Sequence, residues 1–152
     1  MAEDKSLKEY LIKLQRYCAY QERCYQEVRE KLNLIGAPFQ FHQEIISRLE
    51  EENYLNEERF AEMFVRGKFR IKHWGKIKIK QALLAKNINN ELIYKALNEI
   101  NELEYEQTLE KTIRKRNANL KDFSERDKLF KYLLSRGFES HLILSKLNNN
   151  QA

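Results

Sequence analysis

The amino-acid sequence predicts an all-α protein of three tandem three-helix repeats, each about 50 residues long, in an elongated, curved arrangement. Leu, Ile, Glu, Lys and Gln dominate the composition, and the 152 residues include only 4 Gly and 1 Pro. This balance favours helices over sheets. Apolar residues recur at spacings of three and four, as on the buried face of a helix. Helix stops recur at Gly36, Asn87 and Gly137, which lie 51 and 50 residues apart. The predicted repeats are 1–53, 54–100 and 101–152.

The first repeat contains three amphipathic segments. Ser6, with Glu9 three residues later, resembles the capping box of the first helix. Gly36 provides a left-handed stop after the second helix, and Pro38 prevents that helix from continuing. The three apolar faces are carried by Leu7, Leu11 and Leu14, by Val28 and Leu32, and by Ile45 and Leu49.

The middle repeat begins with the clearest helix start in the chain. Asn56 is the expected N-cap, and two glutamates follow it in the first turn, where the helix dipole favours negative charge. Gly75 breaks this helix, and a second helix is expected over residues 76–86. The alternation of Lys and Ile at the start of this second segment also fits a short strand, but its apolar residues continue at helical spacing. In the first helix, Phe60, Phe64 and Ile71 share one face, while Val65 and Phe69 share another.

The third repeat follows the same scheme. A charged helix is expected over residues 102–117, and Ser124 is the expected cap of the next helix, which Gly137 ends. The apolar pair Leu142-Ile143 lies at the same offset from its stop as Leu92-Ile93 does in the middle repeat. The matching offsets support the internal period.

Positive charge is concentrated in one part of the chain. The net charge is +5, yet residues 63–90 contain eight Lys and Arg residues and no Asp or Glu. A second acid-free run spans residues 111–121. Solvated helices usually mix both signs, so these windows predict binding of an anionic partner. The candidate binding residues are Arg66, Lys68, Arg70, Lys72, Lys76, Lys78, Lys80, Lys86, Arg114, Lys115 and Arg116.

Aromatic residues lie among these basic residues. Phe64, Phe69 and Trp74 are placed where rings could stack on bases, although aromatic residues at helical spacing more often belong to a core. For Trp74 the sequence leaves exposed and buried positions equally open.

Catalytic and metal-binding motifs find no support in the sequence. The three histidines are scattered, the four glycines are isolated, and Cys18 and Cys24 match no zinc or redox spacing. We therefore expect a non-enzyme with no cofactor and no metal. The absence of an apolar leader or membrane-length run predicts a cytoplasmic protein with reduced thiols and no membrane partner.

The central stretch resembles the RecX family of bacterial recombination regulators. The resemblance rests on the run from Tyr54 to Ala61, Phe64-Val65, Gly75, the basic helix that ends at Ile88, and the segment 93–97. It covers most of the chain and is strongest over residues 22–97. Two positions depart from the family pattern, with Cys24 in place of a frequent Ser and Asn87 in place of a frequent Gly.

The resemblance implies a fold of tandem three-helix repeats and a non-enzymatic role in DNA repair, recombination and the SOS response. It implies a modulator that binds RecA and the RecA–DNA filament and suppresses the recombinase and ATPase activities of RecA. We expect a monomer that binds DNA weakly by itself, as a single strand. Two alternatives stay open: a stand-alone nucleic-acid-binding module without a RecA partner, and a scaffold whose basic face binds an acidic protein.

Overall fold

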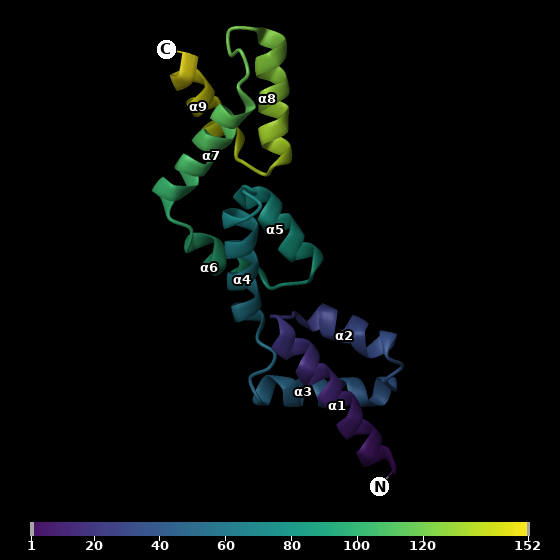
Figure 1. Ribbon diagram of the computed structural model, residues 1–152. Helices are drawn as coiled ribbons and strands as arrows, with labels where there is room; N and C mark the ends of the chain where they lie inside the picture. The colour runs from purple at the N-terminus through teal and green to yellow at the C-terminus, as the bar shows by residue number, and fades with distance from the viewer. Residues whose placement is uncertain (1, 152) are drawn as a thin grey trace.

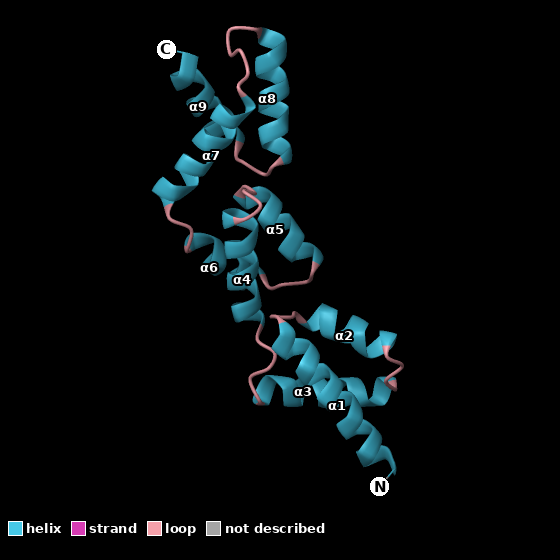
Figure 2. Cartoon of the chain, in the orientation of Figure 1, coloured by secondary structure: helices cyan, strands magenta, loops and turns pink. Residues whose placement is uncertain are grey.

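The computed structural model describes the backbone of residues 2–151 and the side chains of residues 6–149. Within this range the secondary structure is entirely α-helical (Figure 2). The prediction of an all-α fold is confirmed. The helices are α1 (Ala2–Tyr20), α2 (Tyr25–Leu34), α3 (Phe39–Glu51), α4 (Glu57–Arg70), α5 (Lys76–Ala85), α6 (Asn90–Asn98), α7 (Glu102–Arg116), α8 (Phe123–Ser135) and α9 (Ser140–Gln151).

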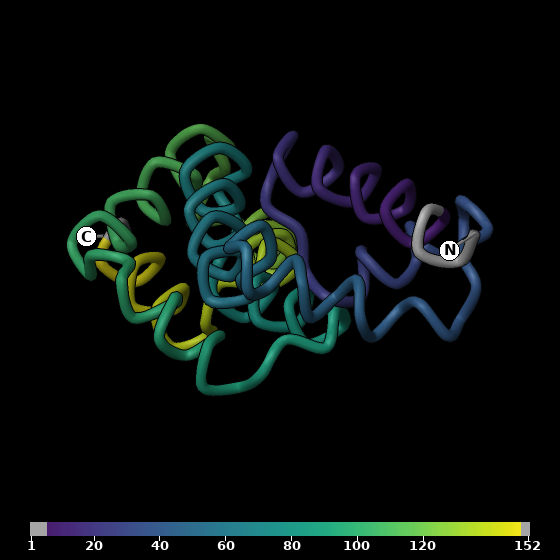
Figure 3. Tube along the Cα trace, turned by 90° about the horizontal axis from the view of Figure 1, so that it is seen from below, coloured from purple at the N-terminus to yellow at the C-terminus, as the bar shows by residue number. Residues whose placement is uncertain are grey.

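The helices follow one another as three groups along an elongated molecule (Figure 1). The group α1–α3 lies at the amino-terminal end, α4–α6 in the middle and α7–α9 at the carboxy-terminal end. Seen from below, the first group and α9 lie on opposite sides of the molecule, so the three groups of helices are not arranged along a straight line (Figure 3). The boundaries proposed after residues 53 and 100 fall in connections between helices, and the division there stays a prediction.

The buried residues form two clusters. The first group has its own core, in which Leu14, Val28, Leu32, Ile45 and Leu49 are fully buried. The second cluster runs without a break from α4 to α9. Tyr105 joins its two halves, since its ring centroid lies 5.7 Å from that of Phe69 and 5.5 Å from that of Phe138. The second and third groups therefore share one core.

The predicted helix stops share a left-handed backbone. The φ angles are +75° at Gly36, +60° at Asn87 and +97° at Gly137. Asparagine tolerates this conformation better than most non-glycine residues, so Asn87 can serve where the family often has glycine. The three stops occupy the same place, directly after the middle helix of each group.

Three local predictions were wrong. Ser6 lies inside α1, which begins at Ala2. Asp122, not Ser124, caps α8, because its Oδ1 accepts hydrogen bonds from the backbone N–H groups of the second and third helical residues. Ile71 is 75% exposed, because it caps the carboxy-terminal end of α4, where the helix has run past its last buried residue, Phe69.

Candidate functional site

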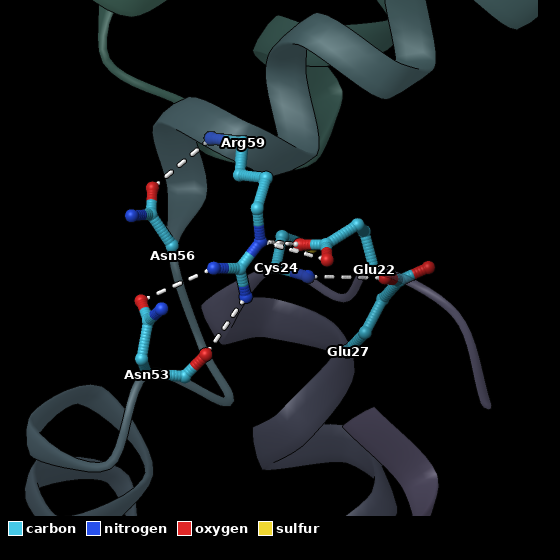
Figure 4. Close-up of polar contacts among 6 residues, drawn as sticks. All are labelled: Glu22, Cys24, Glu27, Asn53, Asn56 and Arg59. Atoms are coloured by element: carbon cyan, nitrogen blue, oxygen red, sulfur yellow. Dashed lines mark hydrogen bonds and ion pairs between the residues drawn. The ribbon is translucent and has the colours of Figure 1, made fainter. Parts of the chain in front are cut away.

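Arg59 holds the joint between the first and second groups (Figure 4). Its Nε donates to both carboxylate oxygens of Glu22 at 2.7 Å. Its Nη1 donates to the side-chain oxygen of Asn53 at 3.1 Å, and its Nη2 donates to the Asn53 carbonyl at 3.0 Å. The guanidinium thus ties the connection after α1 to the connection before α4.

The amino-terminal end of α2 completes this joint. The Cys24 N–H donates to Glu27 at 3.1 Å, so Glu27 keeps the reciprocal half of the capping box although Cys24 replaces the usual serine. The Tyr25 N–H donates to Glu57 of the second group at 2.9 Å. Burial raises the pKa of Glu57, and the Tyr25 N–H and Arg29 partly offset that effect. The start of α2 is therefore completed by a residue of the next group.

The second and third groups meet through direct backbone contact. The Gly75 N–H donates to the Arg136 carbonyl at 2.7 Å, and the Ile77 N–H donates to the Gly137 carbonyl at 3.0 Å. A Cβ atom on Gly75 would lie 2.2 Å from the carbonyl carbon of Gly137. This separation is shorter than any real Cβ contact, so only glycine fits between the two chain segments.

A buried tyrosine supports the same contact. The Tyr105 hydroxyl accepts from the Lys76 N–H at 2.9 Å and donates to the carboxylate of Glu139. Burial, followed by the hydrogen bond to Glu139, raises the pKa of Tyr105, so the hydroxyl keeps its proton. As at the first joint, the first amide of a middle helix is satisfied by a side chain of the following group.

Three residues of the first basic window form ion pairs with other groups. Lys76 Nζ lies 3.0 Å from Glu102, and Arg70 Nε lies 3.6 Å from Glu104. Lys86 Nζ lies 3.4 Å from Glu27 of the first group. Their acidic partners lie outside the window along the chain. These three basic residues therefore connect groups in addition to carrying positive charge.

The remaining residues of this window separate into two sets. Lys68 and Lys78 flank Trp74, with their Nζ atoms 4.8 and 4.4 Å from its ring centroid. Trp74 is half-buried and packs against the core that α4–α9 share. Within the described side chains, no ion pair or hydrogen bond involves the side chains of three exposed residues, Arg66, Lys72 and Lys80.

The second basic window lies at the carboxy-terminal end of α7. Arg114, Lys115 and Arg116 are exposed, and the negative end of the helix dipole favours positive charge there. The Cζ atom of Arg116 lies 3.9 Å from the ring centroid of Tyr132. Together with Arg70, residues 115 and 116 border one hollow, so the structure brings parts of the two windows together.

The two thiols are expected to be unreactive in the folded protein. Burial raises the pKa of Cys18 and of Cys24 from 9.0 to about 11. At a pH below both values the thiolate fraction falls by about 100-fold, and the thiolate is the reactive form. We expect both thiols to react with Ellman's reagent at least 100-fold more slowly at pH 8 than free cysteine, and both to react at once in guanidinium chloride. A fast-reacting thiol in the native protein would contradict this assignment.

The described residues contain no group of three or more His, Cys, Asp or Glu side chains placed to hold a metal ion. In the same part of the chain, every helix is too short or too polar to cross a bilayer.

Comparison with known proteins identifies the family. A family model described as the second three-helix domain of RecX matches residues 56–97. The regulatory protein RecX of Prosthecochloris aestuarii is 31% identical over 134 residues, which cover 87% of this chain and 87% of that protein. This chain belongs to the RecX family. The regulatory protein RecX of Salmonella paratyphi A is 32% identical over 135 residues, with 81% of this chain and 80% of that protein covered.

Some RecX relatives are longer than this chain. The alignment covers 62% of the regulatory protein RecX of Clostridium perfringens at 32% identity, and 48% of that of Oceanobacillus iheyensis at 31% identity. The chain therefore spans about half to two thirds of the length of these relatives.

Solved RecX structures have the same fold. One crystal structure of regulatory protein RecX gives a TM-score of 0.86 at 22% identity and covers 97% of this chain and 75% of that chain. The crystal structure of RecX from Lactobacillus salivarius gives a TM-score of 0.82 at 21% identity and covers 96% and 97%. At this identity the likeness establishes the RecX fold alone.

The sequence analysis did not assign the joint residues of this RecX chain. Arg59 and Gly75 both lie in the family motif, yet Arg59 received no role and Gly75 only that of a helix breaker. Tyr105 is fully buried, and the sequence analysis did not assign its hydroxyl contacts. A polar hydroxyl on an otherwise apolar helix face was the signal available, because a buried hydroxyl requires partners.

Proposed function

We propose that this chain is a non-enzymatic modulator of RecA that binds RecA and the RecA–DNA filament and suppresses its recombinase and ATPase activities. Membership of the RecX family is the observation that carries the proposal. We place the protein in the cytoplasm, as a monomer involved in recombination, DNA repair and the SOS response.

The charge distribution supports an anionic partner. Three exposed basic residues of the first window, Arg66, Lys72 and Lys80, have no side-chain ion pair among the described residues, and Lys68 and Lys78 present ammonium groups beside Trp74. The second window adds Arg114, Lys115 and Arg116. A filament offers both DNA phosphates and protein carboxylates. A positively charged surface raises the rate of association with such a negatively charged target.

Reversal of two exposed lysines tests this proposal. We expect the wild-type protein to lower ATP hydrolysis by RecA on single-stranded DNA. The double variant Lys72→Glu with Lys80→Glu is expected to need about tenfold more protein for half-inhibition, which corresponds to about 1.4 kcal/mol of lost binding. Lys76 is left unchanged, because its ion pair with Glu102 belongs to the joint between groups.

The matched control is Lys8→Glu with Lys13→Glu, two exposed lysines of α1 that lie outside both basic windows. This control changes net charge by the same amount and is expected to inhibit as the wild type does. Failure of the wild-type protein to affect RecA would refute the proposed function. Equal inhibition by both double variants would show that the basic residues Lys72 and Lys80 do not contribute to the inhibition of RecA.

A stand-alone nucleic-acid-binding module is the second candidate. The basic windows favour it equally, since phosphates of bare nucleic acid suit the same side chains. A pull-down that compares RecA alone, DNA alone and the RecA–DNA filament separates the two candidates. Strong binding to bare DNA at physiological salt, with no gain from RecA, would favour the stand-alone module.

A further inference from the structure

A basic groove lies where the second and third groups meet. It has a volume of about 660 Å³ and is formed by the carboxy-terminal end of α4, one face of α7 and the carboxy-terminal end of α8. In Figure 1, α7 and α8 lie close to each other above the end of α4. The groove is lined by Phe69, Arg70, His73, Glu104, Gln107, Thr108, Lys111, Thr112, Lys115, Arg116, Tyr132 and Arg136.

Positive charge dominates this groove. Five of its lining residues are Lys or Arg and one is acidic, and that one, Glu104, is paired with Arg70 at 3.6 Å. Lys111 and Lys115 lie one helical turn apart on α7, and both are exposed. Among the described residues neither lysine has a side-chain ion pair or hydrogen bond. Like charges at this spacing disfavour a helix, so an anion between them would relieve their repulsion.

Arg136 adds unused donors to the groove. Its Nη2 donates to the Lys72 carbonyl, which fixes the guanidinium at the end of α4. Its Nε is buried and has no acceptor among the described residues. Arginine carries five N–H donors in a planar fork, a geometry that matches the oxygens of a phosphate. The guanidinium therefore keeps donor capacity after its one hydrogen bond to the backbone.

Arg116 favours nucleic acid over an acidic peptide. Its guanidinium stacks on Tyr132 at 3.9 Å, yet the residue as a whole is exposed. A planar guanidinium with one free face offers a base a stacking surface. A peptide carboxylate makes no use of such a surface. A duplex presents its phosphates on a convex cylinder, whereas a flexible single strand can follow a concave groove.

We propose that this groove binds the phosphodiester backbone of single-stranded nucleic acid, with Lys111, Lys115 and Arg136 at the phosphates and Arg116 against a base. The inference deepens the proposed function, because it gives the place at which a DNA strand contacts this protein. It rests on that function only for its biological setting, since the groove is tested with bare DNA.

The test measures binding of a fluorescein-labelled oligothymidylate by fluorescence anisotropy over a series of low KCl concentrations. Wild-type protein is compared with Lys111→Gln/Lys115→Gln and with the control Lys8→Gln/Lys13→Gln. The slope of log affinity against log salt is expected to become shallower by about 1.4 in the groove variant, or about 0.7 for each phosphate that the protein no longer neutralises. The control is expected to keep the wild-type slope.

A charge-preserving variant examines the stacking contact separately. Arg116→Lys is expected to weaken binding by about fivefold with no change in the salt slope, because it keeps the charge and removes the planar surface. Melting followed by circular dichroism is expected to be unchanged in both glutamine double variants, because the substituted lysines are exposed.

Two results would overturn the groove assignment. One is a wild-type salt slope in Lys111→Gln/Lys115→Gln. The other is that the same substitutions abolish binding of a polyglutamate peptide but leave binding of the oligothymidylate unchanged. RecA ATPase assays on the same proteins keep the two proposals distinct. If the groove variant no longer inhibits RecA but keeps the wild-type salt slope, the groove binds RecA itself rather than DNA. If the groove variant changes the salt slope but the wild-type protein does not inhibit RecA, the groove assignment stands and the proposed RecA modulator is refuted.

Discussion

Gly75→Ala is expected to lower the free energy of unfolding by about 3 kcal/mol. The φ angle of Gly75 is −75°, which any residue adopts, so the cost comes from space alone. The added Cβ would lie 2.2 to 2.4 Å from the backbone of Gly137 and Phe138, and backbone atoms cannot rotate away as a flexible side chain can. Thermal denaturation checks the prediction, with the melting temperature expected to fall by roughly 6 to 12 °C.

Gly67→Ala is the matched control for this substitution. Gly67 lies within α4, and apart from its chain neighbours and the nearby backbone of its own helix no atom lies within 4 Å of the position that its Cβ would occupy. Alanine there is expected to raise the free energy of unfolding by about 0.5 to 1 kcal/mol, because it restricts the unfolded chain and favours the helix. Equal stability of Gly75→Ala and wild type would show that the contact between Gly75 and Gly137 can open without cost.

Helix positions could be predicted from the sequence because the signals that set them are local. Asn56 caps α4 and accepts from the Arg59 N–H at 3.0 Å, as its place before two glutamates predicts. Asn89 also caps its helix, α6, by accepting from the Glu91 N–H at 2.7 Å. The stops at Gly36 and Gly137 act through the backbone angles of single residues. Such signals need no knowledge of distant contacts.

The joints could not be predicted because each depends on residues far apart in the chain. Gly75 has an ordinary backbone, so nothing near it in sequence indicates that Gly137 excludes a side chain there. Sequence reasoning likewise treated Arg70 and Lys76 only as binding residues. Their acidic partners, Glu104 and Glu102, lie on α7 and become neighbours only once the third group packs against the second.

The candidate site was predictable in composition but not in layout. The sequence identified two basic windows, and the structure places Arg70 of the first on the same groove as Lys115 and Arg116 of the second. Arg136 lies in neither window and borders the same groove. The sequence analysis gives Arg136 no role, because charge counts along the chain do not report which helix ends meet.

Arg59→Met is expected to lower the free energy of unfolding by about 2 kcal/mol, the second-largest loss we expect. Methionine keeps much of the side-chain volume but leaves the Glu22 carboxylate without its partner, and the Glu22 side chain is only 20% exposed. A double-mutant cycle with Glu22→Gln measures the coupling, expected at about 1 to 2 kcal/mol.

Arg48→Met serves as the control for the Arg59 clamp. Arg48 pairs with Glu52 at 3.9 Å on the surface of α3, with both side chains about 40% exposed, and such pairs contribute little. Its loss is expected to change stability by less than about 0.5 kcal/mol. The Arg59 contacts differ because two oxygens of Glu22 and two of Asn53 receive bonds from one planar group. Additive effects of Arg59→Met and Glu22→Gln would show that the guanidinium contributes no coupling across the first joint.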